Sequence, residues 1–179
     1  KGTFVWKQPV KKILYLNDHS RGKSIGLGAY FNSTGAPLKN LVLEKGVMNS
    51  CFYVRDKLGL SADDSIFSLV RLRVLDGESV ALEYCVVPMK FFHDINNHNF
   101  EKASLYDYMQ TQNHFPVTFE QKMTVQKATF PITRIMKIED TDFVYVLEYV
   151  GHDKDGNTVE FTRSYMRCDQ AVYGYEISR

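Results

Sequence analysis

Residues 66–87 alternate between apolar and polar positions in two runs that meet at Asp76-Gly77-Glu78. Alternation with a period of two is typical of β-strands, because side chains two residues apart share a face. In the first run Arg71 and Arg73 share one face, opposite Val70, Leu72 and Val74. In the second run the two sets are Ala81, Glu83 and Cys85 against Val80, Leu82, Tyr84 and Val86. The pattern predicts a β-hairpin with one apolar face and one charged face.

The length of the hairpin loop decides whether these charges meet. A two-residue loop at Asp76-Gly77 would put Glu83 on the face opposite Arg71. A loop of three or five residues pairs Arg71 with Glu83 and Arg73 with Ala81. We predict the odd-numbered loop, centred on Asp76-Gly77-Glu78. Two interpretations of the charged face stay open: a face exposed to solvent, or a cavity in which guanidiniums and a carboxylate bind a small polar molecule.

Similar patterns predict the remaining elements. Strands are expected over residues 40–48, 116–129, 143–150, 158–167 and 172–177, and helices over 50–58, 105–112 and 132–136. Asn49 or Ser50 is expected to cap the first helix, which Gly59 follows, and Ser104 with Asp107 forms a capping pair for the second. Residues 17–37 are expected to be irregular, with at most a short helix near 29–33. Strands that are mostly sequential neighbours predict an α+β fold, an antiparallel sheet with helices packed on it.

Composition narrows the possible functions. The chain has 179 residues, 44% of them hydrophobic, and a net charge of +1, which suits one domain with a sizeable core. This small net charge, on scattered basic residues, offers no surface for nucleic acid. Cys51, Cys85 and Cys168 are far apart and form no Cys-x-x-Cys pair, so we expect free thiols in a reducing compartment, the cytoplasm. No apolar stretch has the length needed to cross a bilayer.

Three motifs in a fixed order carry a family resemblance: Arg71-Leu72-Arg73 through Asp76-Gly77-Glu78 to Ala81-Leu82-Glu83, then Ser104-Leu105-Tyr106-Asp107, then residues 155–165. From about Leu14 onwards the chain resembles the UTRA domain, the effector-binding domain of bacterial GntR-type transcriptional regulators of the HutC subfamily. The resemblance implies a fold similar to chorismate lyase. It also implies a small effector, often a phosphorylated sugar, that lies over the sheet and shifts a dimer between DNA-binding and released states.

The opening Lys1-Gly2-Thr3-Phe4-Val5 resembles the tail of the winged-helix DNA-binding domain that precedes UTRA domains. We therefore interpret residues 1–15 as a linker and the tail of that missing domain, and residues 16–179 as the effector-binding domain. The resemblance implies that the protein contacts DNA only through the missing N-terminal domain. The expected partners are a small-molecule effector and a second copy in a homodimer, without a membrane, a cofactor or a metal ion.

The resemblance implies roles for six residues. Arg71 and Arg73 would meet the anionic or hydroxyl part of the effector. Glu83 and Glu160 would accept hydrogen bonds from its hydroxyl or amino groups, while Ser104 and Tyr106 would add contacts at the start of a helix. A helix N-terminus beside a guanidinium is a suitable place for an anion. The chain departs from the family pattern at Gly26-Leu27-Gly28, Met166 and Cys168, which leaves the identity of the effector open.

The same residues have plainer interpretations. Arg71 and Arg73 would form surface ion pairs with acids such as Glu83, each contributing only ~0–1 kcal/mol. Ser104 would do no more than cap its helix. Tyr106 and Tyr108 would be core or interface aromatics, which is the interpretation we favour for Tyr108. Cys85 is expected to be a buried, inert thiol.

Two other functions compete with that of a sensor. One is an enzyme similar to chorismate lyase, in which an arginine holds a carboxylate and a glutamate acts as acid or base. The other is a structural dimerisation module. The spacing of His93, Asp94 and His98 fits no metal-binding motif, so we expect a surface loop there. Residues 1–5 favour the non-catalytic sensor, because an enzyme does not need the end of a winged helix.

Overall fold

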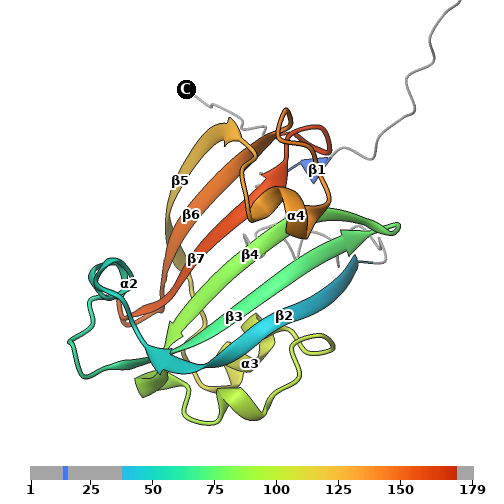
Figure 1. Ribbon diagram of the computed structural model, residues 1–179. Helices are drawn as coiled ribbons and strands as arrows, with labels where there is room; N and C mark the ends of the chain where they lie inside the picture. The colour runs from blue at the N-terminus through green and yellow to red at the C-terminus, as the bar shows by residue number, and fades with distance from the viewer. Residues whose placement is uncertain (1–13, 16–37, 173–179) are drawn as a thin grey trace, which may run out of the picture.

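A six-stranded antiparallel sheet forms the body of the molecule (Figure 1). This computed structural model describes residues 14–15 and 38–172. The strands lie in the order β2-β3-β4-β7-β6-β5, with the bounds β2 Leu38–Asn49, β3 Ser65–Leu75, β4 Glu78–Pro88, β5 Thr118–Lys127, β6 Phe143–His152 and β7 Thr158–Arg167. Two short strands, β1 Leu14–Tyr15 and β8 Ala171–Val172, pair in parallel. The predicted fold class is confirmed.

Helical segments pack on both faces of this sheet. One face, which we name the arginine face because Arg71 and Arg73 lie on it, carries α3 Leu105–Thr111 and the 3-10 turns η2 Met89–Phe91 and η3 Ile95–Asn97. The opposite face, the back face, carries α2 Phe52–Leu58 and α4 Ile132–Met136. The sheet is therefore buried on both sides over much of its area.

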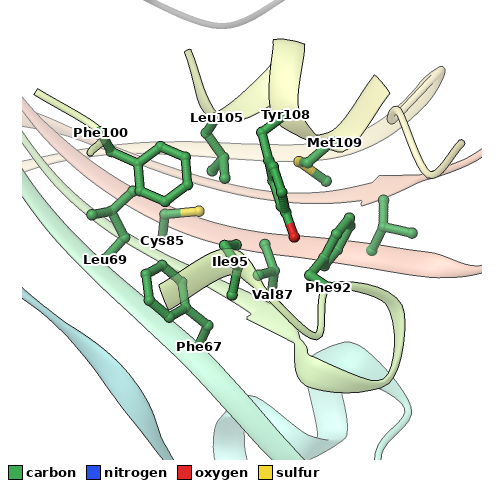
Figure 2. Packing of buried hydrophobic residues seen from close by; sticks show 11 residues of the cluster. Phe67, Leu69, Cys85, Val87, Phe92, Ile95, Phe100, Leu105, Tyr108 and Met109 are labelled. Carbon is green, nitrogen blue, oxygen red and sulfur yellow. The ribbon is translucent and has the colours of Figure 1, made fainter. Parts of the chain in front are cut away.

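The largest hydrophobic cluster lies between α3 and one end of the arginine face (Figure 2). Phe67 and Leu69 of β3 point toward Leu105, Tyr108 and Met109 of α3, and all five side chains are buried. Ser104 caps α3 by accepting a hydrogen bond from the Asp107 N–H at 3.3 Å, as predicted. This packing fixes α3 over the sheet, and the polar side chains of the arginine face lie between this cluster and a second apolar cluster around Leu75 and Met166.

The first helix begins later than predicted. Cys51 is the residue before its first turn, where Asn49 or Ser50 was expected, and no side chain caps the N-terminus. The Ser50 carbonyl instead accepts a hydrogen bond from Arg55 Nη1 at 2.7 Å, so Ser50 stays outside the helix. Gly59 ends the helix with a φ of 61°, as its position predicted, because glycine adopts this left-handed conformation without a steric penalty.

The β3–β4 hairpin has the predicted pairing but not the predicted loop. Arg71 lies opposite Glu83 and Arg73 opposite Ala81, as predicted, but the loop is the two-residue Asp76-Gly77 rather than an odd-numbered one. Both loop residues have positive φ, 52° and 87°, which is the conformation that tight hairpins favour. Arg73 pairs with Ala81 and Val74 with Ser79, so Val80 is left without a partner and forms a bulge. This bulge adds the one residue by which the observed loop is shorter than the predicted one.

The bulge also corrects the predicted position of Val80. The alternation placed Val80 with Leu82, on the face opposite Glu83. In the structure Val80 packs with Ala81, Leu147 and Met166 on the arginine face, since two successive residues of a bulge can point the same way.

The other predicted elements are mostly confirmed. The structure has the strands expected over 40–48, 116–129, 143–150 and 158–167, the helices over 105–112 and 132–136, and the hairpin across residues 153–157. The irregular segment 17–37 lies outside the described residues. Of the last predicted strand, 172–177, only Val172 is described, in β8. The boundary between residues 15 and 16 is likewise not tested.

Candidate functional site

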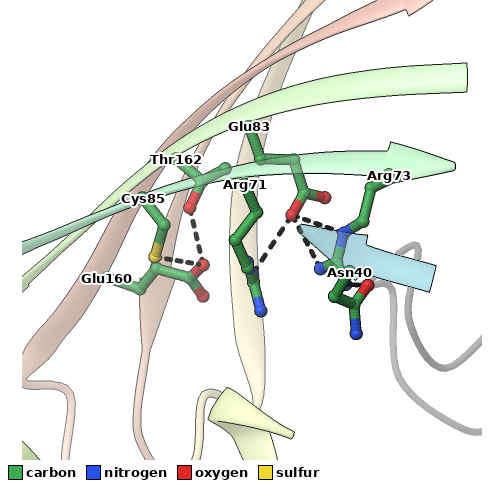
Figure 3. Close-up of polar contacts among 7 residues, drawn as sticks. All are labelled: Asn40, Arg71, Arg73, Glu83, Cys85, Glu160 and Thr162. Atoms are coloured by element: carbon green, nitrogen blue, oxygen red, sulfur yellow. Dashed lines mark hydrogen bonds and ion pairs between the residues drawn. The ribbon is translucent and has the colours of Figure 1, made fainter. Parts of the chain in front are cut away.

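Two arginines and a glutamate form a buried charged cluster on the arginine face (Figure 3). Glu83 Oε2 accepts hydrogen bonds from Arg71 Nη2 at 3.1 Å and from Arg73 Nε at 2.9 Å. Arg73 also donates to the side-chain oxygen of Asn40, on the neighbouring strand β2. Arg71, Arg73 and Glu83 are 7%, 5% and 1% exposed, so they are not the solvated surface pairs of the plainer interpretation.

The cluster is held together by opposite charges away from water. Burial alone would raise the pKa of Glu83, but the charges and hydrogen bonds of Arg73 and Arg71 lower it below its ordinary value. Burial works against the charge of Arg71 as well, and the Glu83 carboxylate offsets it, so the pKa of Arg71 is raised. Two guanidiniums and one carboxylate together carry one positive charge.

A second carboxylate, Glu160 of β7, lies beside this cluster. Its Oε1 accepts hydrogen bonds from Thr162 Oγ1 at 2.7 Å and from the Cys85 thiol at 3.4 Å. Burial raises the pKa of Glu160, and the hydrogen bonds and the charge of Arg71 only partly oppose this. Burial also raises the pKa of Cys85 well above its usual value, so Cys85 is the buried, unreactive thiol that was expected.

Aromatic side chains line the site next to Glu160. Tyr106 of α3 packs against Phe115 and Phe119, with ring centroids 5.7 and 6.4 Å apart, and Phe119 packs edge-on against Tyr149 of β6 at 6.0 Å. Burial raises the pKa of Tyr106 and of Tyr149 well above the usual value, and the neighbouring Glu160 carboxylate raises both further. The Tyr106 hydroxyl is close to Glu160 but does not meet the geometry of a hydrogen bond with it.

Four buried polar atoms in this region have no hydrogen-bond partner among the residues that the structure describes: Arg71 Nε, Tyr106 OH, Glu160 Oε2 and Ser164 Oγ. Ser164 lies directly opposite Glu83 in the β4–β7 pairing, so it shares the arginine face. A buried polar atom without a partner costs about 1–3 kcal/mol, so several together call for a group that pairs with them, such as a water molecule, an ion or a ligand. Arg71 offers a donor, Glu160 an acceptor when ionised, and the hydroxyls can act as either.

The structure brings together five of the six predicted site residues. Arg71, Arg73 and Glu83 are in direct contact, and Glu160 and Tyr106 adjoin them. Ser104 is at the N-terminus of α3, where its described contact is the cap with Asp107. The capping role of Ser104 is confirmed, and its contact with an effector stays a prediction.

Several polar residues of the site were not predicted: Asn40, Tyr149, Thr162 and Ser164. Thr162 and Ser164 could have been found, because they follow Glu160 at steps of two on a predicted strand and so share its face. Tyr149 lies opposite Thr162 in the β6–β7 hairpin. Asn40 gave no local signal, since its pairing with Arg73 depends on which strand lies beside β3.

The positions that departed from the family pattern have structural roles where they are described. Met166 is 1% exposed and packs in the cluster with Val80 and Leu147. Cys168 is partly buried and forms no disulfide, as is true of Cys51 and Cys85. Gly26-Leu27-Gly28 lies outside the described residues.

Hydrogen bonds and ring contacts hold the loop that contains Asp94 and His98. Asp94 accepts hydrogen bonds from Tyr108 OH at 2.5 Å and from His98 Nε2 at 3.5 Å. The His98 ring packs against Tyr108, which is itself buried in the core as predicted. Within residues 38–172, no group of three or more His, Cys, Asp or Glu side chains could hold a metal ion. No helix in the same part of the chain is long and apolar enough to cross a membrane.

The sequence of this chain is similar to those of known transcriptional regulators. The HTH-type transcriptional regulator GgaR of Escherichia coli (strain K12) is 26% identical over 133 residues, which cover 74% of this chain and 52% of GgaR. The HTH-type transcriptional repressor NagR of Bacillus subtilis (strain 168) is 21% identical over 183 residues, which cover 100% of this chain and 71% of NagR. The chain thus spans about half the length of GgaR.

The fold has a close counterpart among solved structures. The effector domain of PhnF from Mycobacterium smegmatis superposes with a TM-score of 0.81 at 16% identity, covering 86% of this chain and 95% of that domain. This similarity agrees with the expected chorismate lyase-like fold. The family model of the UTRA domain matches residues 33–171, most of the chain. The chain therefore belongs to the UTRA domain family.

Proposed function

We propose that this chain is the effector-binding half of a bacterial GntR-type, HutC-subfamily transcriptional regulator, and that it senses a small anionic or phosphorylated metabolite. The main support is the set of buried polar atoms on the arginine face that have no partner within residues 38–172, namely Arg71 Nε, Tyr106 OH, Glu160 Oε2 and Ser164 Oγ. GgaR and NagR, which the chain resembles, carry the names of transcriptional regulators. The expected location of such a regulator is the cytoplasm.

The chemistry of these atoms defines the ligand class. The positive sum of Arg71, Arg73 and Glu83 favours an anionic group, such as a phosphate or a carboxylate. Glu160 Oε2 requires a donor, a hydroxyl or an ammonium group, when the carboxylate is ionised. Tyr106 and Tyr149 provide aromatic walls of the kind that pack against a small ligand. A sugar phosphate or amino-sugar phosphate carries all of these groups.

Regulation follows from linkage between two sites. If the effector prefers one placement of the effector-binding domain relative to the DNA-binding domain, it shifts operator affinity by the same factor that operator shifts effector affinity. Such coupling is typically ~1–3 kcal/mol. DNA contact would come only through an N-terminal winged-helix domain, because the chain has a net charge of +1. Two-fold operators would require a homodimer.

Native mass spectrometry of the purified chain, followed by titration calorimetry, tests the proposal. The probes are glucose 6-phosphate, glucosamine 6-phosphate, inorganic phosphate and unphosphorylated glucosamine. We expect at least one organic phosphate to bind more tightly than inorganic phosphate and the free sugar, because it alone engages both the arginines and Glu160. A retained metabolite in the mass spectrum would name the ligand directly. A chain that retains nothing and binds no organic anion would contradict the proposal.

One observation favours an enzyme as the second candidate. Glu160 has a raised pKa and lies beside the buried Arg71, and a carboxyl group with a raised pKa can act as a general acid. Incubating the chain with any ligand that binds, and following the ligand by mass spectrometry, separates the two candidates. An unchanged ligand supports the sensor, and turnover that Glu160→Gln abolishes supports the lyase-like enzyme.

A further inference from the structure

The two oxygen atoms of the buried Glu160 carboxyl group have different surroundings (Figure 3). Oε1 accepts hydrogen bonds from Thr162 Oγ1 at 2.7 Å and from the Cys85 thiol at 3.4 Å. Oε2 is buried and accepts no hydrogen bond within the part of the chain that the structure describes. An ionised carboxylate accepts at both oxygens, whereas a protonated one can donate from one oxygen while the other accepts. The contacts of Glu160 therefore match a neutral acid with its proton on Oε2.

The groups that face Glu160 from other elements do little to stabilise a negative charge on it. They are Arg71 of β3, Cys85 of β4, Tyr106 of α3 and Tyr149 of β6. The pKa values of Cys85, Tyr106 and Tyr149 are raised well above their usual range, so these three groups stay uncharged near neutral pH. Arg71 is charged, but its Nη2 donates to Glu83. Burial outweighs these contacts and raises the pKa of Glu160.

The net charge of the site depends on whether Glu160 is ionised. Arg71, Arg73 and Glu83 together carry one positive charge. An ionised Glu160 would cancel this charge and would place a buried carboxylate beside the anionic group of an effector. Like charges repel strongly away from water, so an anionic effector disfavours the ionised form of Glu160. A proton on Oε2 removes this repulsion and provides a hydrogen-bond donor for the effector.

An ammonium group on the effector would replace this proton. It would bring a positive charge to Oε2 and donate to the ionised carboxylate, which favours loss of the proton from Glu160. A hydroxyl group at the same place can instead accept a hydrogen bond from the protonated acid. One proton thus determines which of two similar ligands the site prefers.

We propose that Glu160 binds a proton together with an effector that presents a hydroxyl group to it, and gives up this proton to solvent when the effector presents an ammonium group. This inference rests on the proposed function, because it assigns a preference to the same effector site. Glu160 then makes the site select between the two kinds of ligand by pH. Falling pH favours the hydroxyl ligand, and rising pH favours the ammonium ligand.

Titration calorimetry with glucose 6-phosphate and glucosamine 6-phosphate tests this linkage, because the two sugars differ in a hydroxyl or an ammonium group at one carbon. Each titration is run near neutral pH in two buffers with different ionisation enthalpies, so the difference in heat counts the protons exchanged with the buffer. We expect glucose 6-phosphate to bind with uptake of protons. Glucosamine 6-phosphate is expected to take up fewer protons or to release them.

Glu160→Gln separates the proton of Glu160 from the titration of the ligands themselves. Glutamine is neutral and similar in size, so it replaces the protonated acid. As the pH rises from about 6 to about 8, the affinity of the unsubstituted chain for glucose 6-phosphate is expected to fall relative to that of the variant, by up to about tenfold per pH unit. For glucosamine 6-phosphate near neutral pH, the variant is expected to bind at least about tenfold more weakly. The matched control, Glu120→Gln on an exposed side chain of β5, should behave as the unsubstituted chain does.

Two results would overturn the inference while an organic phosphate still binds: the same pH dependence with and without Glu160→Gln, or the same number of exchanged protons for the two sugars. Either result leaves the proposed function in place. Circular dichroism shows whether the variant is folded, and if it is not, the buffer comparison on the unsubstituted chain decides. A chain that binds neither sugar phosphate contradicts the proposed function and this inference with it.

Discussion

Glu83 is the residue whose charge holds the two arginines of the site in place. Its single oxygen Oε2 accepts from both guanidiniums, and the side chain is almost completely buried. A buried ion pair contributes less than its Coulomb energy suggests, but removing one partner leaves the other charge without compensation. The folded chain can therefore bury Arg71 and Arg73 at low cost only while Glu83 is present and ionised.

We predict that Glu83→Gln lowers the free energy of unfolding by about 3–5 kcal/mol, because two buried guanidiniums lose their counter-charge. Urea denaturation followed by circular dichroism measures this change. Glu120→Gln, on an exposed side chain of β5, is the control and is expected to change stability by less than about 0.5 kcal/mol. Similar stabilities for the two variants would mean that Glu83 is not needed to neutralise the arginines.

Tyr106 and Tyr108 provide a matched pair of hydroxyl deletions. The Tyr106 hydroxyl is buried without a described partner, so Tyr106→Phe is expected to leave stability unchanged or to raise it by up to about 1 kcal/mol. The same change should weaken the binding of the organic phosphate identified by calorimetry about fivefold or more. Tyr108 donates to Asp94 at 2.5 Å, so Tyr108→Phe is expected to destabilise the protein without affecting binding. The reverse pattern would remove Tyr106 from the site.

At the scale of elements, the turn between β6 and β7 is organised by one carboxylate. Asp153 accepts hydrogen bonds from the backbone N–H groups of Asp155 and Asn157, from the Asn157 side chain and from His114 Nδ1 at 2.7 Å. Burial would raise the pKa of Asp153, but these donors lower it to about 2. The His114 contact ties the turn to the loop that follows α3.

This turn makes stability depend on acidity. Because the pKa of Asp153 is lower in the folded chain than in the unfolded one, its contribution is complete above the unfolded value of 3.8 and is lost as the pH falls from about 4 to about 2. Glu83 acts in the same direction, whereas Glu160, with a raised pKa, acts in the opposite one. Asp153→Asn should flatten the fall in unfolding free energy over this range, measured by urea titrations at several pH values. An unchanged pH dependence would show that Asp153 has an ordinary pKa.

Gly151 allows the loop after α3 to approach β6 and Glu160. A Cβ atom at this position would lie 3.0 Å from Pro116 Cβ, 3.3 Å from Phe119 and 3.5 Å from Glu160 Cβ. Gly151→Ala is therefore expected to cost about 1–3 kcal/mol of stability, measured by thermal or urea denaturation. Gly46→Ala, on β2 with no atom within 4 Å of the new Cβ, is the control and should be nearly neutral. Equal effects at the two positions would contradict the close contact.

Local patterns predicted these elements well, and long-range pairing less well. Alternation identified the strands, whereas the correct pairing of Arg71 with Glu83 was predicted from an odd-numbered loop that the structure does not have. It missed the Val80 bulge, which local alternation does not reveal. β4 pairs with β7, which brings together residues about 80 positions apart, such as Glu83 and Ser164. The pattern within one segment does not show which strands are neighbours, so it could not predict the polar cluster around Glu160.

At the scale of the whole molecule, the proposed regulator has its sensing and DNA-binding functions in different parts of the protein. The chain alone, with a net charge of +1, is expected to show no specific affinity for operator DNA. The intact regulator is expected to bind its operator and to change that affinity by about 5–150-fold when the effector is added. A gel-shift titration with and without the effector measures the change. Equal operator affinity under both conditions would contradict allosteric control.

The bulge at Val80 also determines which changes of length the hairpin can accept. Val80 is the one residue between Glu78 and Pro88 that has no partner on β3. Deleting Val80 would therefore leave a regular two-residue hairpin in which Arg73 still lies opposite Ala81 and Arg71 opposite Glu83. A relative with a hairpin one residue shorter at this position is accordingly expected to keep its carboxylate beside the two arginines, although an alignment would show a gap there.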